Sequence, residues 1–116
     1  MTDEVLVGPI CRRQEVTEVP KVFAAEEIAR TGVIVVEKNN TVRAFENVCP
    51  HAFARLDFAN TPVAALDGYH ILCNVHGAQF DPVSGVCTLG PCVGAKLTSL
   101  KVKEVEHDIY IVKRDV

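Results

Sequence analysis

The apolar positions of the chain recur at the short period that is typical of β-strands. Residues 33–36 are a β-branched run, Val-Ile-Val-Val, which is too short for a helix. After a polar stretch at 38–40, residues 41–45 alternate between polar and apolar side chains. The two segments predict a hairpin in which residues 38–40 form the turn.

The end of the chain repeats this arrangement. Residues 100–103 alternate, residues 106–108 form a polar turn, and residues 109–112 return as Ile-Tyr-Ile-Val, which predicts a second hairpin. Only Ala24–Arg30 has a helical pattern, and it spans two turns at most. Further short strands are expected at 6–12, 21–25, 64–66, 70–72 and 86–88. Many short strands with close turns indicate an all-β fold, an antiparallel sandwich or barrel.

Composition limits the classes of function. The 116 residues suit a single domain, 1–116, and 48% hydrophobic with 23% charged residues suits a globular one. A net charge of −3 argues against nucleic acid as a partner. No apolar run approaches the ~20 residues of a membrane span. The acidic start, Met1–Glu4, is unlike a signal peptide, so we expect a cytoplasmic protein.

Five cysteines are the strongest compositional signal. An odd number in a reducing compartment indicates metal chemistry before disulfides. Two short motifs supply the candidate ligands. Cys49 and His51 form a Cys-x-His, and Cys73 and His76 form a Cys-x-x-His, each directly after a predicted strand. The two loops therefore offer two thiolates and two imidazoles.

The spacing of these ligands favours two adjacent metal atoms over one. Structural zinc accepts two Cys and two His, but zinc-finger spacing pairs Cys with Cys and His with His. Here each loop supplies one of each, and a single residue between Cys49 and His51 makes it hard for both to reach one tetrahedral ion. A [2Fe-2S] cluster with two Cys on one iron and two His on the other fits better. A zinc-stapled domain stays open as the alternative.

The chain resembles the Rieske proteins, and more closely their soluble, low-potential ferredoxins of the aromatic-ring-hydroxylating oxygenase type. Residues 49–51 match the first ligand box of the family, and residues 73–77 match the second. Gln79–Asp81 matches the strand after the second box. Ser84–Gly85 matches the following turn, and Gly90–Pro91 the loop that covers the cluster.

The resemblance implies a Rieske-like fold with two cluster-binding loops at one end. It implies one [2Fe-2S] cluster per chain, with Cys49 and Cys73 on the inner iron and His51 and His76 on the outer, solvent-facing iron. The implied function is that of a one-electron carrier, not an enzyme. Its partners would be a flavin-dependent NAD(P)H reductase as donor and a terminal, ring-hydroxylating oxygenase as acceptor. A monomer is the expected state of such a shuttle.

Some positions depart from the family pattern. The stretch between the boxes is long, with an insertion near Asp57–Pro62, and the usual glycine after the first box is missing. High-potential members carry a disulfide where this chain has Ala54 and Val75, and hydroxyls where it has Ala78 and Phe80. Each lost donor leaves the reduced cluster less stabilised. We therefore expect a potential on the order of −150 mV, at the low end of the Rieske range.

Two other functions stay open. The chain could be a small, non-catalytic Rieske-like subunit of a larger reductase such as nitrite reductase. It could also be a redox sensor that uses Cys87 and Cys92, although two small buried thiols are the simpler interpretation and a disulfide between them is the alternative. Cys11 is expected in the core, whereas His70 and His107 are expected in solvent.

Overall fold

The computed structural model describes residues 4–50, 53–58 and 61–113. The strands are β1 (Val5–Arg12), β2 (Lys21–Ala25), β3 (Ala29–Lys38), β4 (Thr41–Glu46), β5 (Ile71–Leu72), β6 (Gln79–Phe80), β7 (Cys87–Leu89), β8 (Ser99–Leu100), β9 (Val102–Val105) and β10 (Asp108–Lys113). A short 3-10 helix, η1 (Arg13–Glu15), follows β1. The expected all-β, antiparallel fold is therefore confirmed.

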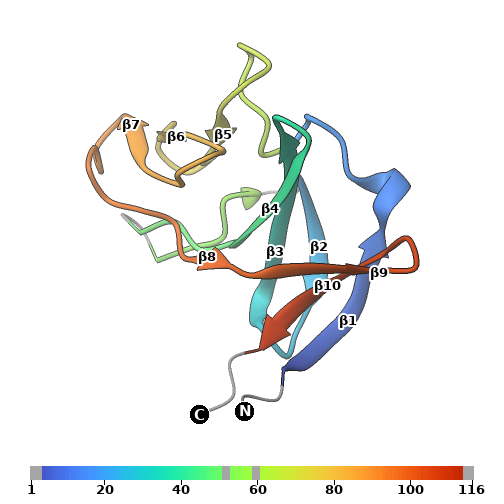
Figure 1. Cartoon of the computed structure of the whole chain (residues 1–116). Coiled ribbons are helices and arrows are strands. Elements are labelled where there is room, and N and C mark those ends of the chain that lie inside the picture. The colour runs from blue at the N-terminus through green and yellow to red at the C-terminus, as the bar shows by residue number, and fades with distance from the viewer. Residues whose placement is uncertain (1–3, 51–52, 59–60, 114–116) are drawn as a thin grey trace.

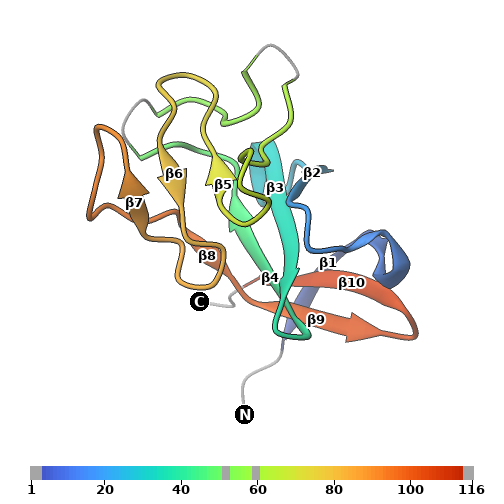
Figure 2. The same cartoon turned by 90° about the horizontal axis from the view of Figure 1, so that it is seen from above.

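In the described part of the chain the strands form three sheets, in the orders β1-β10-β9, β2-β3-β4-β8 and β5-β6-β7. The sheet that contains β3 lies between the other two (Figure 1). Seen from above, β5, β6 and β7 lie on one side of β3 and β4, with the β9–β10 hairpin on the other (Figure 2).

This central position explains why residues 33–36 are all apolar. Ile34 and Val36 point to one side of the sheet and Val33 and Val35 to the other, and all four side chains are at most 1% exposed. A strand that is buried on both faces cannot alternate with polar residues.

Each face of the central sheet covers its own core. The loop-side core contains Ile34, Val36, Phe45, Cys49, Leu56, Val63, Ile71, Cys73, Ala78, Phe80, Cys87 and Leu97. The terminal core contains Cys11, Val16, Ala25, Val33, Val35, Ala44, Ile109 and Ile111. The expected place of Cys11 in the core is thus confirmed. Cys49 and Cys73 both belong to the loop-side core.

Both predicted hairpins are present, with shorter turns than expected. β3 and β4 pair from Lys38 with Thr41, so only Asn39 and Asn40 form the turn. β9 and β10 pair from Val105 with Asp108. Asp108 therefore belongs to a strand, whereas Leu100 lies in β8 and pairs with β4. The four turn residues have positive φ values of 48–73°, as a two-residue hairpin turn of this twist requires.

The helix expected at Ala24–Arg30 is wrong. β2 ends at Ala25 and β3 begins at Ala29. Between them is a turn, in which the Ile28 N–H donates to the Ala25 carbonyl at 2.9 Å. Ala25 pairs across the turn with Ala29, so the segment is the tip of a hairpin. The strand expected at 64–66 is reduced to one bridge between Ala64 and Ile71. No helix among the described residues is long and apolar enough to cross a membrane.

Candidate metal centre

The two loops that carry the motifs are built alike. The Cys49 N–H donates to the Ala54 carbonyl at 2.7 Å, and the Cys49 carbonyl accepts from the Phe53 N–H at 2.7 Å. In the second loop, Cys73 makes the same two bonds with residues at the same offsets. Its N–H donates to Ala78 at 2.8 Å, and its carbonyl accepts from Gly77 at 2.9 Å. Each cysteine therefore begins a tight backbone loop that closes on the carbonyl of the residue five positions later.

Both loops need a left-handed residue just before the chain returns. Gly77 supplies it in the second loop with φ +75°, a conformation that glycine adopts without strain. In the first loop Phe53 adopts the left-handed conformation, with φ +53°. Its side chain is 84% exposed. Phe53 thus stands where the missing glycine was expected.

Leu56 joins the two loops through its backbone. Its N–H donates to the Asn47 side-chain oxygen at 2.9 Å, and its carbonyl accepts from the Asn74 N–H at 2.9 Å. The fully buried Asn47 amide also donates to the Thr31 carbonyl and to Asp57 Oδ1, both at 2.9 Å. We call Asn47, Leu56 and Asn74 the loop clamp.

The loop clamp also anchors the ends of the segment where an insertion was expected. Asp57 binds Arg55 at 2.6 Å, and Asn74 donates to the Pro62 carbonyl at 2.7 Å. Sequence reasoning missed the clamp. The only available signal was two asparagines beside the ligand motifs, one before Cys49 and one after Cys73.

The structure brings Cys49 and Cys73 together. Both are at most 1% exposed, and they are neighbours in the loop-side core. Burial raises the pKa of the Cys73 thiol, and the nearby Cys49 adds to this, while the N–H groups of Val75 and His76 oppose it by donating to the Cys73 sulfur. Two buried sulfurs, one of which accepts backbone N–H bonds, fit a group that binds through thiolates.

His76 differs from the two cysteines in its exposure to solvent. His76 is exposed, on the turn that begins at Cys73. His51 lies outside the described residues. Within residues 4–50, 53–58 and 61–113, no three His, Cys, Asp or Glu side chains are grouped to hold a metal ion.

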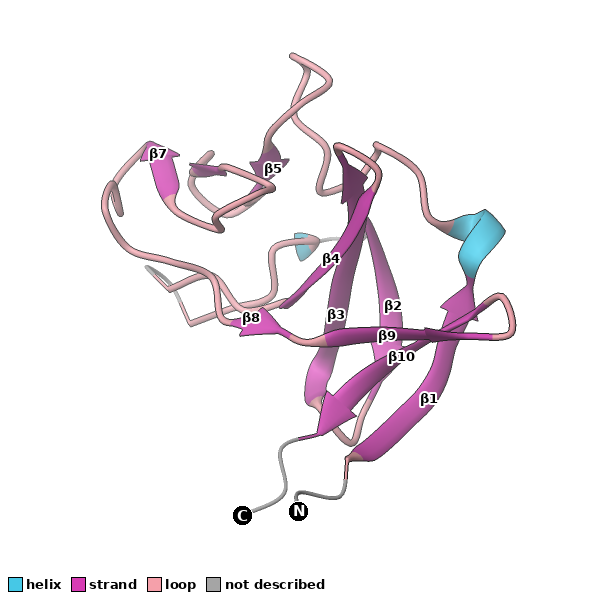
Figure 3. Ribbon diagram, viewed as in Figure 1, coloured by secondary structure: helices cyan, strands magenta, loops and turns pink. Residues whose placement is uncertain are grey.

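A third loop lies beside the two ligand loops, between β7 and β8. Both views place it next to the first loop, at the same end of the molecule as the β5–β6 turn, and this end is mostly loop and turn (Figures 1, 2 and 3). Gly90 rests on the second loop, because a Cβ placed there would lie 2.8 Å from the Ala78 Cα. The Gly90–Pro91 segment thus lies against the turn that carries Cys73 and His76.

The turn between β6 and β7 agrees with the motif at Ser84–Gly85. Asp81 accepts from the Val83 N–H through its side chain at 2.7 Å and from the Gly85 N–H through its carbonyl at 2.7 Å. Gly85 has φ +78°, and a Cβ there would lie 2.9 Å from the Phe45 ring. A side chain at this position would displace a buried aromatic ring of the loop-side core.

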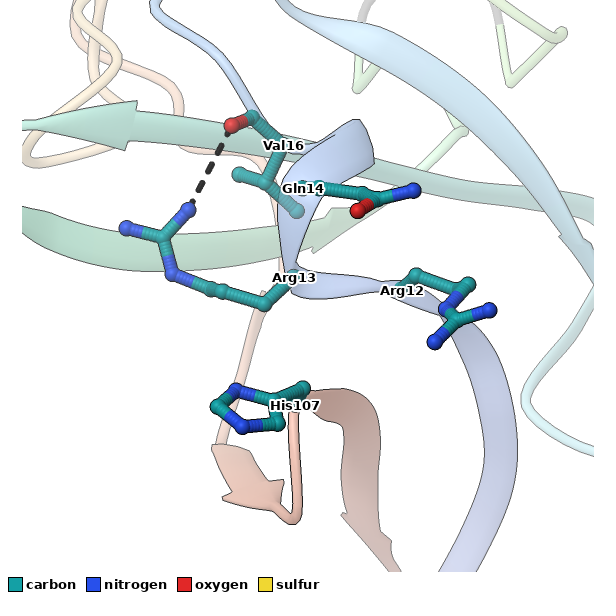
Figure 4. A pocket seen from close by; sticks show the side chains of 5 residues that line it. All are labelled: Arg12, Arg13, Gln14, Val16 and His107. Atoms are coloured by element: carbon teal, nitrogen blue, oxygen red, sulfur yellow. Dashed lines mark hydrogen bonds between the residues drawn. The ribbon is translucent and has the colours of Figure 1, made fainter.

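Histidines outside the motifs lie elsewhere. His70 bonds Asp67 through its ring, and backbone N–H groups of His70 and Tyr69 lower the pKa of Asp67 to about 2. His107 is exposed at the β9–β10 turn. It lines a pocket of about 380 Å³ with Arg12, Arg13, Gln14 and Val16 (Figure 4). The segments that carry these residues, η1 and the β9–β10 turn, lie on the other side of the central sheet from β5, β6 and β7 (Figure 2). Arg13 already forms ion pairs with Glu37 and Glu104.

The chain is similar to known proteins over most of its length. The family model of the Rieske [2Fe-2S] domain matches residues 7–112. No protein with a curated description matches the chain. Similar solved structures include two ferredoxins and one chain of a complex between an oxygenase and a ferredoxin.

The ferredoxin of Sphingomonas yanoikuyae B1 is 22% identical with a TM-score of 0.72, over 96% of this chain and 99% of that one. The ferredoxin of carbazole 1,9a-dioxygenase from Nocardioides aromaticivorans IC177 is 26% identical with a TM-score of 0.65, over 93% and 95%. A chain of the complex of reduced oxygenase and oxidised ferredoxin in carbazole 1,9a-dioxygenase is 21% identical with a TM-score of 0.68, over 97% and 96%.

The family model spans both ligand loops and all but the ends of the chain. Its cofactor is a [2Fe-2S] cluster, one per domain. The chain belongs to the Rieske [2Fe-2S] domain family.

Proposed function

We propose that the protein is a one-electron carrier whose [2Fe-2S] cluster is held by Cys49, His51, Cys73 and His76. The observation that supports this most strongly is the pair of matched loops, which buries two cysteines in the same core and leaves His76 exposed. The cluster supplies reversible one-electron transfer at a potential that histidine ligation raises above that of all-cysteine centres. The protein would bind the cluster and leave its histidine-ligated side accessible to solvent.

Cys49 and Cys73 would hold the cluster from the buried side, and His51 and His76 would hold it from the exposed side. Cys49 and Cys73 lie in the loop-side core, where water is excluded and the Val75 and His76 N–H groups stabilise negative charge on the Cys73 sulfur. An exposed imidazole ligand would provide a route for electron transfer between the cluster and the protein surface. His51 is assigned to the same role by the matching motif alone.

The surface around the ligand loops suits a transient partner. Phe53, Leu89 and Val93 are 84%, 56% and 66% exposed. Phe53 lies in the first loop, Leu89 ends β7, and Val93 lies in the third loop. Exposed apolar side chains around an electron exit are typical of small, short-lived redox interfaces. We propose that this face docks on the acceptor.

The partners are proposed from the relatives. One similar ferredoxin belongs to carbazole 1,9a-dioxygenase, and another similar structure is a complex of the oxygenase and ferredoxin of that enzyme. We therefore assign the acceptor as a terminal, ring-hydroxylating oxygenase and the donor as a flavin-dependent NAD(P)H reductase. A monomeric carrier in the cytoplasm, where NAD(P)H is available, fits both exchanges.

The ligand set is tested by single substitutions with matched controls. Cys73→Ala, His76→Ala and His51→Ala should each lose most of the bound iron and sulfide, and with it reduction by NAD(P)H through a flavin reductase. Cys11→Ala and His107→Ala change the same residue types away from the loops and should retain both. A His76→Ala protein with full iron content and normal reduction would contradict the assignment.

A further inference from the structure

A second pair of thiols lies beside the candidate centre. Cys87 begins β7, and Cys92 lies in the loop that follows. The Cys92 thiol donates to the Cys87 sulfur with 3.0 Å between the sulfurs, and the Cys87 thiol donates to the Leu89 carbonyl at 3.3 Å. Both are free thiols. The two thiols therefore interact directly, which the simpler interpretation of two separate buried cysteines does not include.

The backbone holds the two residues close together. The Cys87 N–H donates to the Ala95 carbonyl at 2.7 Å, and the Cys87 carbonyl accepts from the Gly94 N–H at 3.0 Å. The Ala95 N–H in turn donates to the Cys92 carbonyl at 2.9 Å. Because these three bonds close the loop, the backbone itself holds Cys87 and Cys92 close to each other.

The two thiols differ in access. Cys87 is 1% exposed, whereas Cys92 is half-buried and packs on the edge of the loop-side core. An accessible thiol next to a buried one is the arrangement in which the first reacts with a small disulfide and the second displaces the small thiol. The sulfurs need to approach by roughly 1 Å to reach the bond length of about 2.05 Å.

We propose that Cys87 and Cys92 form a reversible thiol–disulfide site in the third loop. A low-molecular-weight disulfide of the glutathione class is the oxidant. The Cys92 thiolate attacks it, one sulfur–sulfur bond breaks as the mixed disulfide forms, and one small thiol leaves. The Cys87 thiolate then displaces the second small thiol. Two electrons pass from the cysteines to the oxidant, and each released thiol takes up one proton.

Oxidation acts on the ligand loops through Gly90. The disulfide closes a ring over residues 87–92, and Gly90 within that ring rests on Ala78. Ala78 in turn accepts the Cys73 N–H at 2.8 Å. The new bond therefore constrains a segment that leans on the turn carrying Cys73 and His76. This consequence rests on the proposed cluster ligation, whereas disulfide formation does not.

The test uses the cluster-loaded protein and an excess of glutathione disulfide at alkaline pH, because burial and the nearby Cys87 raise the pKa of Cys92 to about 12 and keep the thiolate scarce at neutral pH. After treatment the protein is denatured in acid, alkylated and weighed. The wild type has five cysteines, and it should lose two alkylatable thiols without carrying a glutathione adduct. Cys11→Ala should also lose two, because it leaves the pair intact. Cys92→Ser should lose none.

The proposal is overturned if the wild type keeps all its alkylatable thiols, if a stable glutathione adduct persists, or if Cys92→Ser still loses two. The midpoint potential of the bridged and reduced forms is then compared. A shift in the wild type that is absent in Cys92→Ser supports the coupling through Gly90, and identical potentials overturn it. Visible absorbance of the cluster is recorded throughout, so a protein without cluster that still forms the disulfide contradicts only the proposed function.

Discussion

Phe53 occupies in the first ligand loop the position that Gly77 occupies in the second, and both have left-handed φ values. A residue with a Cβ is strained there by roughly 1 kcal/mol, and glycine is not. The Phe53 side chain is 84% exposed, so it offers little packing in return. Sequence reasoning noted a missing glycine but not this substitute, because residue type does not report backbone angle.

Replacing Phe53 should therefore change stability according to backbone preference. We expect Phe53→Gly to raise the free energy of unfolding by about 1 kcal/mol and Phe53→Val, with a branched Cβ, to lower it by a similar amount. Denaturant unfolding followed by circular dichroism measures both. The reciprocal change Gly77→Ala serves as the control and should lower it. Equal stability of the Gly and Val proteins would contradict the matched-loop account.

Phe80 is the residue at which the low potential can be tested. It is fully buried in the loop-side core with Cys49 and Cys73. In Phe80→Tyr the added hydroxyl would stabilise the more negative, reduced centre. A gain of about 1 kcal/mol corresponds to a midpoint potential roughly 50 mV higher.

The control for this prediction is Phe23→Tyr, which adds the same hydroxyl beside the terminal core and should leave the potential unchanged. Redox titration of the three proteins gives the result. A Phe80→Tyr potential equal to or below that of the wild type would show that this position does not tune the centre.

Among the elements, the longest were the easiest to predict. The 33–36 run identified β3, and the alternation after it identified β4, because burial sets their pattern directly. β5, β6 and β8 have two residues each, and backbone bonds among loops set their limits. The expected helix at Ala24–Arg30 failed because its apolar residues pack a hairpin tip, which a short window cannot distinguish from a helical turn.

The loop clamp links these elements and was invisible in the apolar pattern. Asn47→Ala removes three side-chain hydrogen bonds and leaves the buried Leu56 N–H without its acceptor. We expect a loss of about 3 kcal/mol in the free energy of unfolding and reduced cluster retention.

Gln14→Ala removes an exposed amide and is the matched control, with an expected change within about 0.5 kcal/mol. Denaturant unfolding and iron content measure both variants. An Asn47→Ala protein as stable as Gln14→Ala would mean that the clamp does not hold the ligand loops in place.

At the scale of the whole molecule, the central sheet separates two tasks. Its terminal core joins it to β1 and β10, and its loop-side core carries both candidate cysteines. The ligand motifs could be found from sequence because the number of residues between each Cys and His limits which metal centres they can bind. Their meeting at one end follows from the fold, in which the turns that begin at Cys49 and Cys73 both close on that core. The resemblance predicted that the Gly90–Pro91 loop lies beside the ligand motifs, and Gly90 does lie against Ala78.

The central claim is that the four residues of the two loops hold a low-potential [2Fe-2S] cluster. The most direct test is the electron paramagnetic resonance spectrum of the dithionite-reduced protein, purified without added metal, with its midpoint potential from the same titration. We expect a rhombic signal averaging near g ~1.9 and a potential on the order of −150 mV. A silent spectrum together with stoichiometric zinc would contradict the account and leave a zinc-stapled domain.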